Sequence, residues 1–210
     1  MNDVDAPGFV ASLARPGGTI TGLSIQSRAL SGKLLGVLKD AVPCLARVAV
    51  LWDPEDTANQ RHTLEHAAQA VVIRLQIVEV RSPDDFDGAF ATAHTARAEG
   101  LMMVGSPLLT QHAARLAELA AHHRWPAVYS TRRFAEAGGL LAYGPKESDP
   151  NWVERRAAVF VDKILKGATP ADLPVEQPTK FELVINLKTA KEPGLTIPPT
   201  VPFQGDEVIK

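Results

Sequence analysis

Two histidines and a glutamate in the short stretch RHTLEH form the pattern in this chain that most resembles a catalytic signature. His62, Glu65 and His66 follow the spacing H-x-x-E-H. On a helix, two histidines at this spacing can hold zinc while the glutamate acts as a base. Catalytic zinc also needs a third protein ligand and a dry pocket, and the sequence singles out no residue for that role. A zinc-dependent hydrolase is therefore one hypothesis.

Composition and charge exclude several other classes of protein. The 210 residues are 45% hydrophobic, which is enough for a substantial core, and the net charge is only -2. The charges form no basic stripe, so neither nucleic acid nor an anionic membrane is an expected partner. Direct membrane insertion is not expected either, because no apolar run approaches the roughly 20 residues of a membrane span. Cys44 is the only cysteine, which excludes an intramolecular disulfide and a thiolate metal cluster. No metal and no cofactor is expected, and a small organic solute is the favoured partner.

Apolar periodicity predicts that strands and helices alternate along most of the chain. A helix is expected over Ser27–Ala41, and the continuous apolar run Arg47–Trp52 predicts a strand buried on both faces. Helices are expected after this strand up to Val72, from SPDD onward, over 109–123 and over 132–137, and strands at RLQIVEV, LMMVG, PAVYS and GLLAYG. The alternation indicates an α/β fold with a parallel sheet and helices on both faces.

The last third of the sequence has a different character. A helix is expected over Trp152–Lys166, and KFELVINLKTAK predicts a strand followed by a helix. The tail GLTIPPTVPFQGDEVIK is expected to be irregular, because its prolines disfavour regular structure.

This order of elements changes the interpretation of RHTLEH. The stretch lies on the helix after the first buried strand, where the apolar residues Leu64, Ala68 and Val71 must face the sheet. His62 and His66 are then expected on the solvent side, so the zinc hypothesis becomes the alternative.

In a parallel α/β sheet, ligands bind beyond the carboxyl ends of the strands. Asp53, Thr57 and Asn59 follow the first strand and could bind the ammonium or carboxylate group of an amino acid. Asp53 and Thr57 could equally cap the next helix, and both interpretations stay open. Ser106 has the same position after LMMVG, although a Ser-Pro turn explains such a pair as well.

Aromatic side chains also lie at strand ends. Tyr129 and Tyr143 could stack on a ligand ring there, while core or hinge packing is the alternative. For Trp52, core packing is the favoured interpretation.

Several long phrases resemble a known family when they are taken together and in order. They are ASLARPGGTITGLS, LLGVLKDAVPCLARVAVLWDP, AGGLLAYGP and VDKILKGATPADLPVEQPTKFELVINLKTAKEPGLTIPP. These phrases resemble the substrate-binding proteins of ABC transporters, in the family that includes tryptophan- and tyrosine-type binding components. The resemblance runs over essentially the whole chain.

The resemblance implies a type I periplasmic-binding-protein fold, in which two α/β lobes enclose a ligand cleft. Residues 24–139 would form a complete second lobe, and residues 1–23 a remnant of the first lobe with a crossover. Residues 140–210 would hold a further crossover and a C-terminal segment that packs largely with the first lobe. One lobe is thus expected to be complete and the other incomplete.

The resemblance also implies a function without chemistry. The chain would be the solute-binding component of an ABC-type importer for an amino acid or a similar solute, and not an enzyme. Its partner would be the transporter permease, and its location periplasmic, or extracellular with a lipid anchor. The sequence as written lacks the family's export signal, so the chain would stay cytoplasmic. Most of the first lobe is also missing, so impaired binding or a non-functional remnant is a further expectation.

Overall fold

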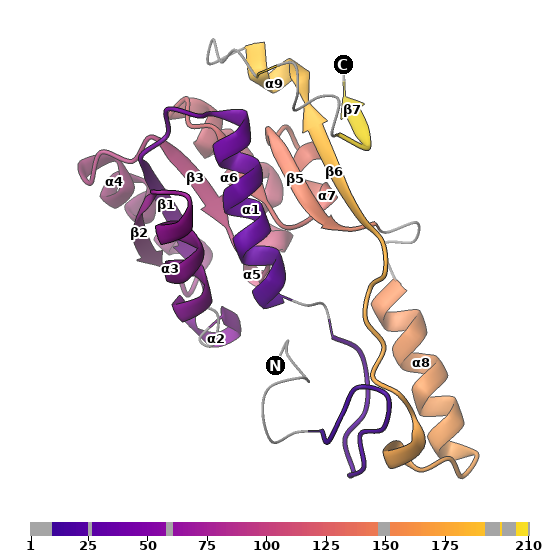
Figure 1. Ribbon diagram of the computed structural model, residues 1–210. Helices are drawn as coiled ribbons and strands as arrows, with labels where there is room; N and C mark the ends of the chain where they lie inside the picture. Colours follow the sequence, from indigo (N-terminus) through magenta and orange to yellow (C-terminus); the bar gives the residue numbers. More distant parts are fainter. Residues whose placement is uncertain are drawn as a thin grey trace. The chain divides into compact units, whose positions relative to one another are not determined.

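A seven-stranded sheet organises the larger part of the chain in the computed structural model (Figure 1). The structure describes residues 10–24, 27–57, 61–146, 152–191, 198 and 205–209. The strand order across the sheet is β2-β1-β3-β4-β5-β6-β7. The strands are β1 Arg47–Trp52, β2 Arg74–Glu79, β3 Gly100–Met103, β4 Ala127–Tyr129, β5 Leu141–Pro145, β6 Phe181–Asn186 and β7 Glu207–Ile209.

The sheet is mostly parallel, which confirms the predicted α/β class. Strand β1 pairs in parallel with β2 and β3, and the parallel pairing continues through β4 to β5. Strand β6 runs antiparallel to β5, because Asn186 donates a backbone hydrogen bond to Leu140 at one end and Lys146 donates one to Lys180 at the other. Strand β7 then pairs in parallel with β6.

Helices cover both faces of the sheet, as predicted. Helices α1 and α3 lie on one face, and α4 to α7 lie on the other (Figure 1). The helices among the described residues are α1 Ser27–Ala41, α2 Pro54–Thr57, α3 Arg61–Ala70, η2 Pro83–Asp85, α4 Phe86–Thr95, α5 Pro107–Gln111, α6 Ala113–His122, α7 Arg132–Glu136, α8 Trp152–Leu165, η3 Pro170–Asp172 and α9 Leu187–Lys191.

The hydrophobic pattern explains how the two helix layers attach. The leucines of α1, Leu30, Leu34, Leu35 and Leu38, are all buried. On the other face, Phe86, Phe90 and Leu116 form one buried cluster with Ala49 and Leu51 of β1. Strand β1 therefore contributes side chains to both layers, as its continuous apolar run predicts.

Two local expectations were wrong. The single helix expected over 109–123 is instead the pair α5 and α6, which is interrupted at His112. The first of the two begins two residues earlier than expected, because Ser106 caps it and Pro107 occupies its first turn. The tail expected to be irregular contains β7, which extends the sheet.

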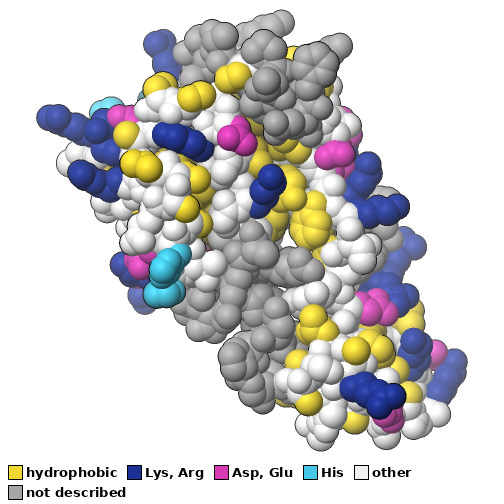
Figure 2. Space-filling model, viewed as in Figure 1, with side chains coloured by type: hydrophobic (Ala, Val, Ile, Leu, Met, Phe, Trp, Pro, Cys, Tyr) yellow, Lys and Arg dark blue, Asp and Glu magenta, His cyan; other side chains and the backbone are white. Residues whose placement is uncertain are grey.

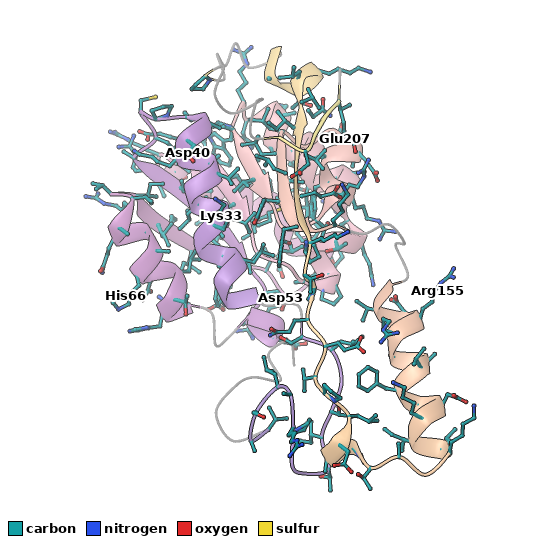
Figure 3. The ribbon with its side chains drawn as sticks, turned by 45° about the vertical axis from the view of Figure 1, so that its right-hand side comes forward. Lys33, Asp40, Asp53, His66, Arg155 and Glu207 are labelled. Carbon is teal, nitrogen blue, oxygen red and sulfur yellow. The ribbon has the colours of Figure 1, made fainter. Side chains whose placement is uncertain are left out.

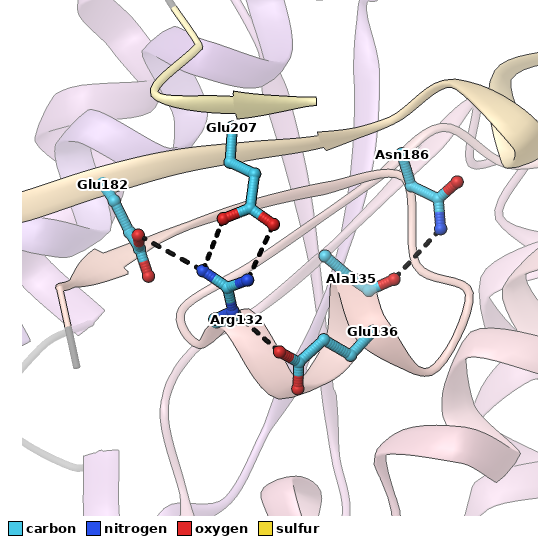
Figure 4. Close-up of polar contacts among 6 residues, drawn as sticks. All are labelled: Arg132, Ala135, Glu136, Glu182, Asn186 and Glu207. Carbon is cyan, nitrogen blue, oxygen red and sulfur yellow. Dashed lines mark hydrogen bonds and ion pairs between the residues drawn. The ribbon is translucent and has the colours of Figure 1, made fainter. Parts of the chain in front are cut away.

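A partly buried arginine network holds β7 in place (Figure 4). Arg132 of α7 donates two hydrogen bonds to the Glu207 carboxylate, at 2.8 and 2.7 Å, and a third to Glu136 at 2.7 Å. Its guanidinium also lies 3.5 Å from the buried carboxylate of Glu182 on β6. Hydrogen bonds donated to the carboxylates of Glu207 and Glu136 raise the pKa of Arg132 above its usual value. The network joins three segments that lie far apart in the sequence.

The chain divides into two compact units. The larger unit contains Arg28–Gly144 and Glu182–Lys210, and it holds nearly the whole sheet. The smaller unit contains residues up to Ser27 and Pro145–Phe181. In the smaller unit, Ser24 and Glu176 are joined by a 2.9 Å backbone hydrogen bond, and Arg156 of α8 pairs with the Glu176 carboxylate. The assignment of these units to the lobes of a binding protein stays a prediction.

Candidate functional site

The polar residues that the sequence places after strands gather at one edge of the sheet. Because β1, β3, β4 and β5 are parallel neighbours, their carboxyl ends point the same way. Asp53 follows β1, Ser106 lies in the loop after β3, and Ser130 follows β4 directly. All three side chains are buried. A buried polar edge of this kind is where α/β proteins commonly bind ligands.

Asp53 and Ser106 are in direct contact. The Ser106 hydroxyl donates a hydrogen bond of 2.7 Å to Oδ2 of Asp53, although 53 residues separate them in the chain. The other carboxylate oxygen of Asp53 accepts the backbone N–H of Glu55 at 3.1 Å, and Ser106 Oγ accepts that of Leu109 at 3.3 Å. Both residues therefore hold the starts of helices, which is what the capping interpretation predicts for Asp53. The ligand-binding interpretation stays a prediction.

The remaining candidates near Asp53 cannot be placed in the same way. Thr57 is the last residue of α2, and its side chain lies outside the described part. Asn59 lies outside the described residues altogether.

Ser130, the last residue of the predicted strand PAVYS, directly follows β4 and is a further functional candidate. A Cβ atom on Gly105 would lie 3.0 Å from Ser130 Oγ, and one on Gly144 would lie only 2.1 Å from the Ser130 carbonyl oxygen. The loop after β3 and strand β5 itself can thus approach the end of β4 this closely only because both positions are glycine. The available signal was its place at the end of PAVYS, between two glycine-containing strand ends.

Tyr129 is buried completely and lies on the face of the sheet that α4 to α7 cover. Its ring stacks on Phe134, with ring centroids 4.4 Å apart and planes 9° from parallel. Its hydroxyl has no hydrogen-bond partner, and burial raises its pKa above the usual value. This packing supports the core alternative for Tyr129, so its role as a ligand contact stays a prediction without structural support.

Tyr143 has a more open position on β5. It is half-buried, and the ammonium group of Lys33 lies 5.9 Å from the centre of its ring. Burial and then the nearby Asp206 carboxylate raise the pKa of Tyr143. Lys33, which the sequence-based selection did not include, brings a positive charge to this tyrosine. Figure 3 labels Lys33 on α1 and Asp53 at the end of β1.

The H-x-x-E-H residues lie on the exposed side of α3, as the element order predicts. His62 and His66 are exposed, their ring centroids are 4.7 Å apart, and histidine side chains appear at the surface over α3 in Figure 2. Glu65 is held by Arg61 in an ion pair of 3.0 Å. Within the described residues, no group of three or more potential ligands is arranged to hold a metal ion. No structural observation therefore favours the zinc hypothesis.

A second group of histidines lies where α4 and α6 end. The ring of His123 stacks on Trp125 with centroids 4.6 Å apart. The ring centroids of His94 and His122 lie 5.6 and 5.4 Å from that of His123. Burial lowers the pKa of His123, and the neighbouring histidine charges lower it further. Protonation of His123 is therefore disfavoured in the folded state.

Comparison with known proteins agrees with the fold. A family model described as ABC transporter substrate binding protein matches residues 3–209. No curated protein sequence matches the chain. Within the described residues, no helix is both long and apolar enough to cross a membrane.

Solved structures with this fold come from several bacteria. An ABC domain from Streptococcus pneumonia in complex with L-Trp is 23% identical, with a TM-score of 0.80 over 95% of this chain and 66% of its own. A conserved domain protein from Vibrio cholerae is 21% identical, with a TM-score of 0.85 over 99% of this chain and 69% of its own. The ligand-free, open structure of CD0873, a substrate-binding protein from Clostridium difficile, is 18% identical, with a TM-score of 0.67 over 100% of this chain and 68% of its own. This chain spans about two thirds of their length, and the likeness confirms the type I binding-protein fold.

Proposed function

Because the chain belongs to the ABC transporter substrate-binding protein family, we propose that it binds a small organic solute for an ABC-type importer. The proposed solute is an amino acid or a molecule of similar size and polarity. The Streptococcus pneumonia structure, which is described as a complex with L-Trp, supports this class. The proposed action is binding without a covalent step, in which the solute shifts the population toward a closed form.

The observation that carries this proposal is the buried Asp53–Ser106 pair at the carboxyl edge of the sheet. A carboxylate and a hydroxyl together accept and donate hydrogen bonds, which suits a solute with an ammonium group. The helix-capping bonds fix both side chains before any solute arrives. Such preorganisation reduces the ordering cost of binding.

Other residues of the same edge extend the proposed site. Ser130 adds a hydroxyl, and Tyr143 adds a half-buried ring on which an aromatic solute could stack. Thr57 and Asn59 remain proposed contacts from the sequence, and Tyr129 is retained only as packing beneath the edge. The proposed partner is a transporter permease, and the proposed location is periplasmic, or extracellular with a lipid anchor.

A thermal-shift screen of the purified chain against L-amino acids and small aromatic acids tests this proposal. A solute at about 100 times its Kd stabilises the folded state by about 2.7 kcal/mol. Asp53→Asn removes the charge at nearly constant shape and is expected to weaken binding about tenfold or more.

Ser106→Ala and Ser82→Ala form a matched pair, because both serines precede a helical segment after a strand. Both variants are expected to lose about 1 kcal/mol of stability, but only Ser106→Ala should lose the response to the solute. A screen in which no solute raises the melting temperature would count against the proposal. Equal responses from wild type and Asp53→Asn would exclude this site.

A further inference from the structure

Two buried oxygen atoms near the start of α7 have no hydrogen-bond partner in the part of the chain that the structure describes. One is Oε1 of Glu182 on β6, a residue that is only 3% exposed. The other is the hydroxyl oxygen of Thr131, which directly precedes α7. Buried atoms of this kind are rare in folded proteins and often mark a bound water molecule or ion. A carboxylate oxygen costs more in this state than a neutral hydroxyl such as that of Tyr129, because it belongs to a charged group.

The two atoms belong to segments that meet at Gly144 of β5. The antiparallel pairing of β5 and β6 places Glu182 directly opposite Gly144. On the β4 side, a Cβ atom on Gly144 would lie 3.7 Å from the Cα atom of Thr131. The Glu182 side chain faces α7, since its carboxylate lies 3.5 Å from the guanidinium of Arg132. Glu182 and Thr131 therefore flank the same glycine.

Arg132 compensates the charge of Glu182 only in part. Its hydrogen bonds to Glu207 and Glu136 have lengths of 2.7 to 2.8 Å. Its distance of 3.5 Å to Glu182 is longer than the usual range of about 2.7–3.2 Å for such bonds, and in Figure 4 a dashed line joins only one Glu182 oxygen to Arg132. Three carboxylates thus share one guanidinium, which leaves a net charge of -2 in this network. A buried carboxylate with so little pairing is costly.

We propose that Oε1 of Glu182 and the hydroxyl oxygen of Thr131 bind one small monovalent cation beside Gly144. The cation adds the positive charge that the arginine network lacks, and carboxylate and hydroxyl oxygens are ligands that hard cations prefer. A divalent metal ion is disfavoured, because no group of three or more potential ligands among the described residues is placed to hold one. Sodium, potassium and ammonium ions share the required chemistry. The cation ties β6 to the segment between β4 and α7, whether or not Asp53 and Ser106 bind a solute.

Melting temperatures of the purified chain in a series of chloride salts at equal ionic strength test this proposal. The salts are those of sodium, potassium, ammonium and tetramethylammonium. Tetramethylammonium is the reference, because it screens charges but is too large to lie between two buried side chains. At about ten times its Kd, a bound cation is expected to raise the melting temperature by about 3–6 °C above the reference. The rise should saturate with salt concentration, and the salt that produces it identifies the ion.

Three variants locate the bound cation. Glu182→Gln keeps the shape of the side chain and removes its charge, so it should abolish the cation-specific rise. Glu136→Gln is the matched control, because it removes another carboxylate of the same network from a side chain that is 55% exposed, and the rise should remain. Thr131→Val keeps the size of the side chain and removes a hydroxyl that makes no capping bond to α7, so it should reduce the rise. This variant decides the question if Glu182→Gln does not fold.

Three results would overturn the proposal. The first is a melting temperature that is the same in all four salts. The second is a rise that Glu182→Gln or Thr131→Val retains in full. The third is an equal loss of the rise in Glu136→Gln and Glu182→Gln, because the effect would then belong to the arginine network as a whole.

Discussion

Replacement of Tyr129 by phenylalanine separates core packing from ligand binding at this position. The Tyr129 hydroxyl is buried without a hydrogen-bond partner, whereas the ring stacks on Phe134. Tyr129→Phe removes only the hydroxyl and keeps the stacked ring. A buried, unpaired hydroxyl costs about 1–3 kcal/mol relative to water. The variant is therefore expected to be more stable than wild type by roughly 1 kcal/mol.

The environment of the ring sets this magnitude. The ring borders a cavity of about 10 Å³ that is lined largely by alanines and glycines, among them Ala117, Ala120 and Gly139. A gain of 1 kcal/mol raises the melting temperature by about 2–4 °C for a chain of this size. If a water molecule filled the cavity and bonded to the hydroxyl, the variant would instead lose about 1 kcal/mol.

Urea unfolding followed by tryptophan fluorescence measures the free energy difference. Tyr143→Phe is the matched control, since Tyr143 is the only other tyrosine and is half-buried. No comparable gain is expected for it. Solute binding should be the same for Tyr129→Phe and wild type. Destabilisation by Tyr129→Phe would refute the unpaired state of the hydroxyl, and a loss of solute binding would refute the assignment of Tyr129 to the core.

Three further predictions concern the backbone and the titration of the fold. Gly144→Ala should destabilise the protein by roughly 2–3 kcal/mol in urea unfolding, because its Cβ would lie 2.1 Å from a backbone oxygen. Gly88→Ala is the control, because its Cβ meets open space, and it should stabilise helix α4 by about 0.5–1 kcal/mol. Equal effects of the two variants would contradict the close approach at Gly144. Val72 has a φ of 55°, so Val72→Gly should raise the free energy of unfolding by roughly 0.5–1 kcal/mol, and a decrease would contradict this geometry. The pKa of His123 is lowered in the folded state, so its contribution to stability is present above the unfolded pKa of about 6.5 and is lost as the pH falls below that value. His123→Gln should reduce the loss of unfolding free energy as the pH falls below about 6.5. If the free energy of unfolding of the variant depended on pH as it does in wild type, this role of His123 would be contradicted.

The strongly periodic segments could be predicted because their burial depends on local pattern. The run RVAVLW became β1, buried as expected, and the leucines of α1 face the core. Strand β7 could not be predicted in this way. It has three residues, and Arg132, which lies 75 positions earlier, holds it through Glu207. Such a long-range contact leaves no periodic signal in the tail.

The candidate site, like the fold, could be predicted from the sequence only in part. Sequence placed Asp53 and Ser106 after strands, and topology then brings such residues to one edge. Their direct hydrogen bond required the knowledge that β1 and β3 are neighbours. The sequence also placed Ser130 after a strand, but it could not show the close approach of Gly105 and of Gly144 in β5 to this residue. The H-x-x-E-H pattern, in contrast, is recognisable in the local sequence, but among the described residues it belongs to no group of three potential metal ligands.

Titration of the 15N-labelled chain with L-tryptophan and then with other L-amino acids, followed by amide chemical shifts, tests the central claim most directly. We predict saturable shifts, for at least one solute, that cluster around Asp53, Ser106 and Ser130 and that disappear in Asp53→Asn. Shifts that do not saturate for any solute, or that cluster on α3 around His62, would contradict the proposed function.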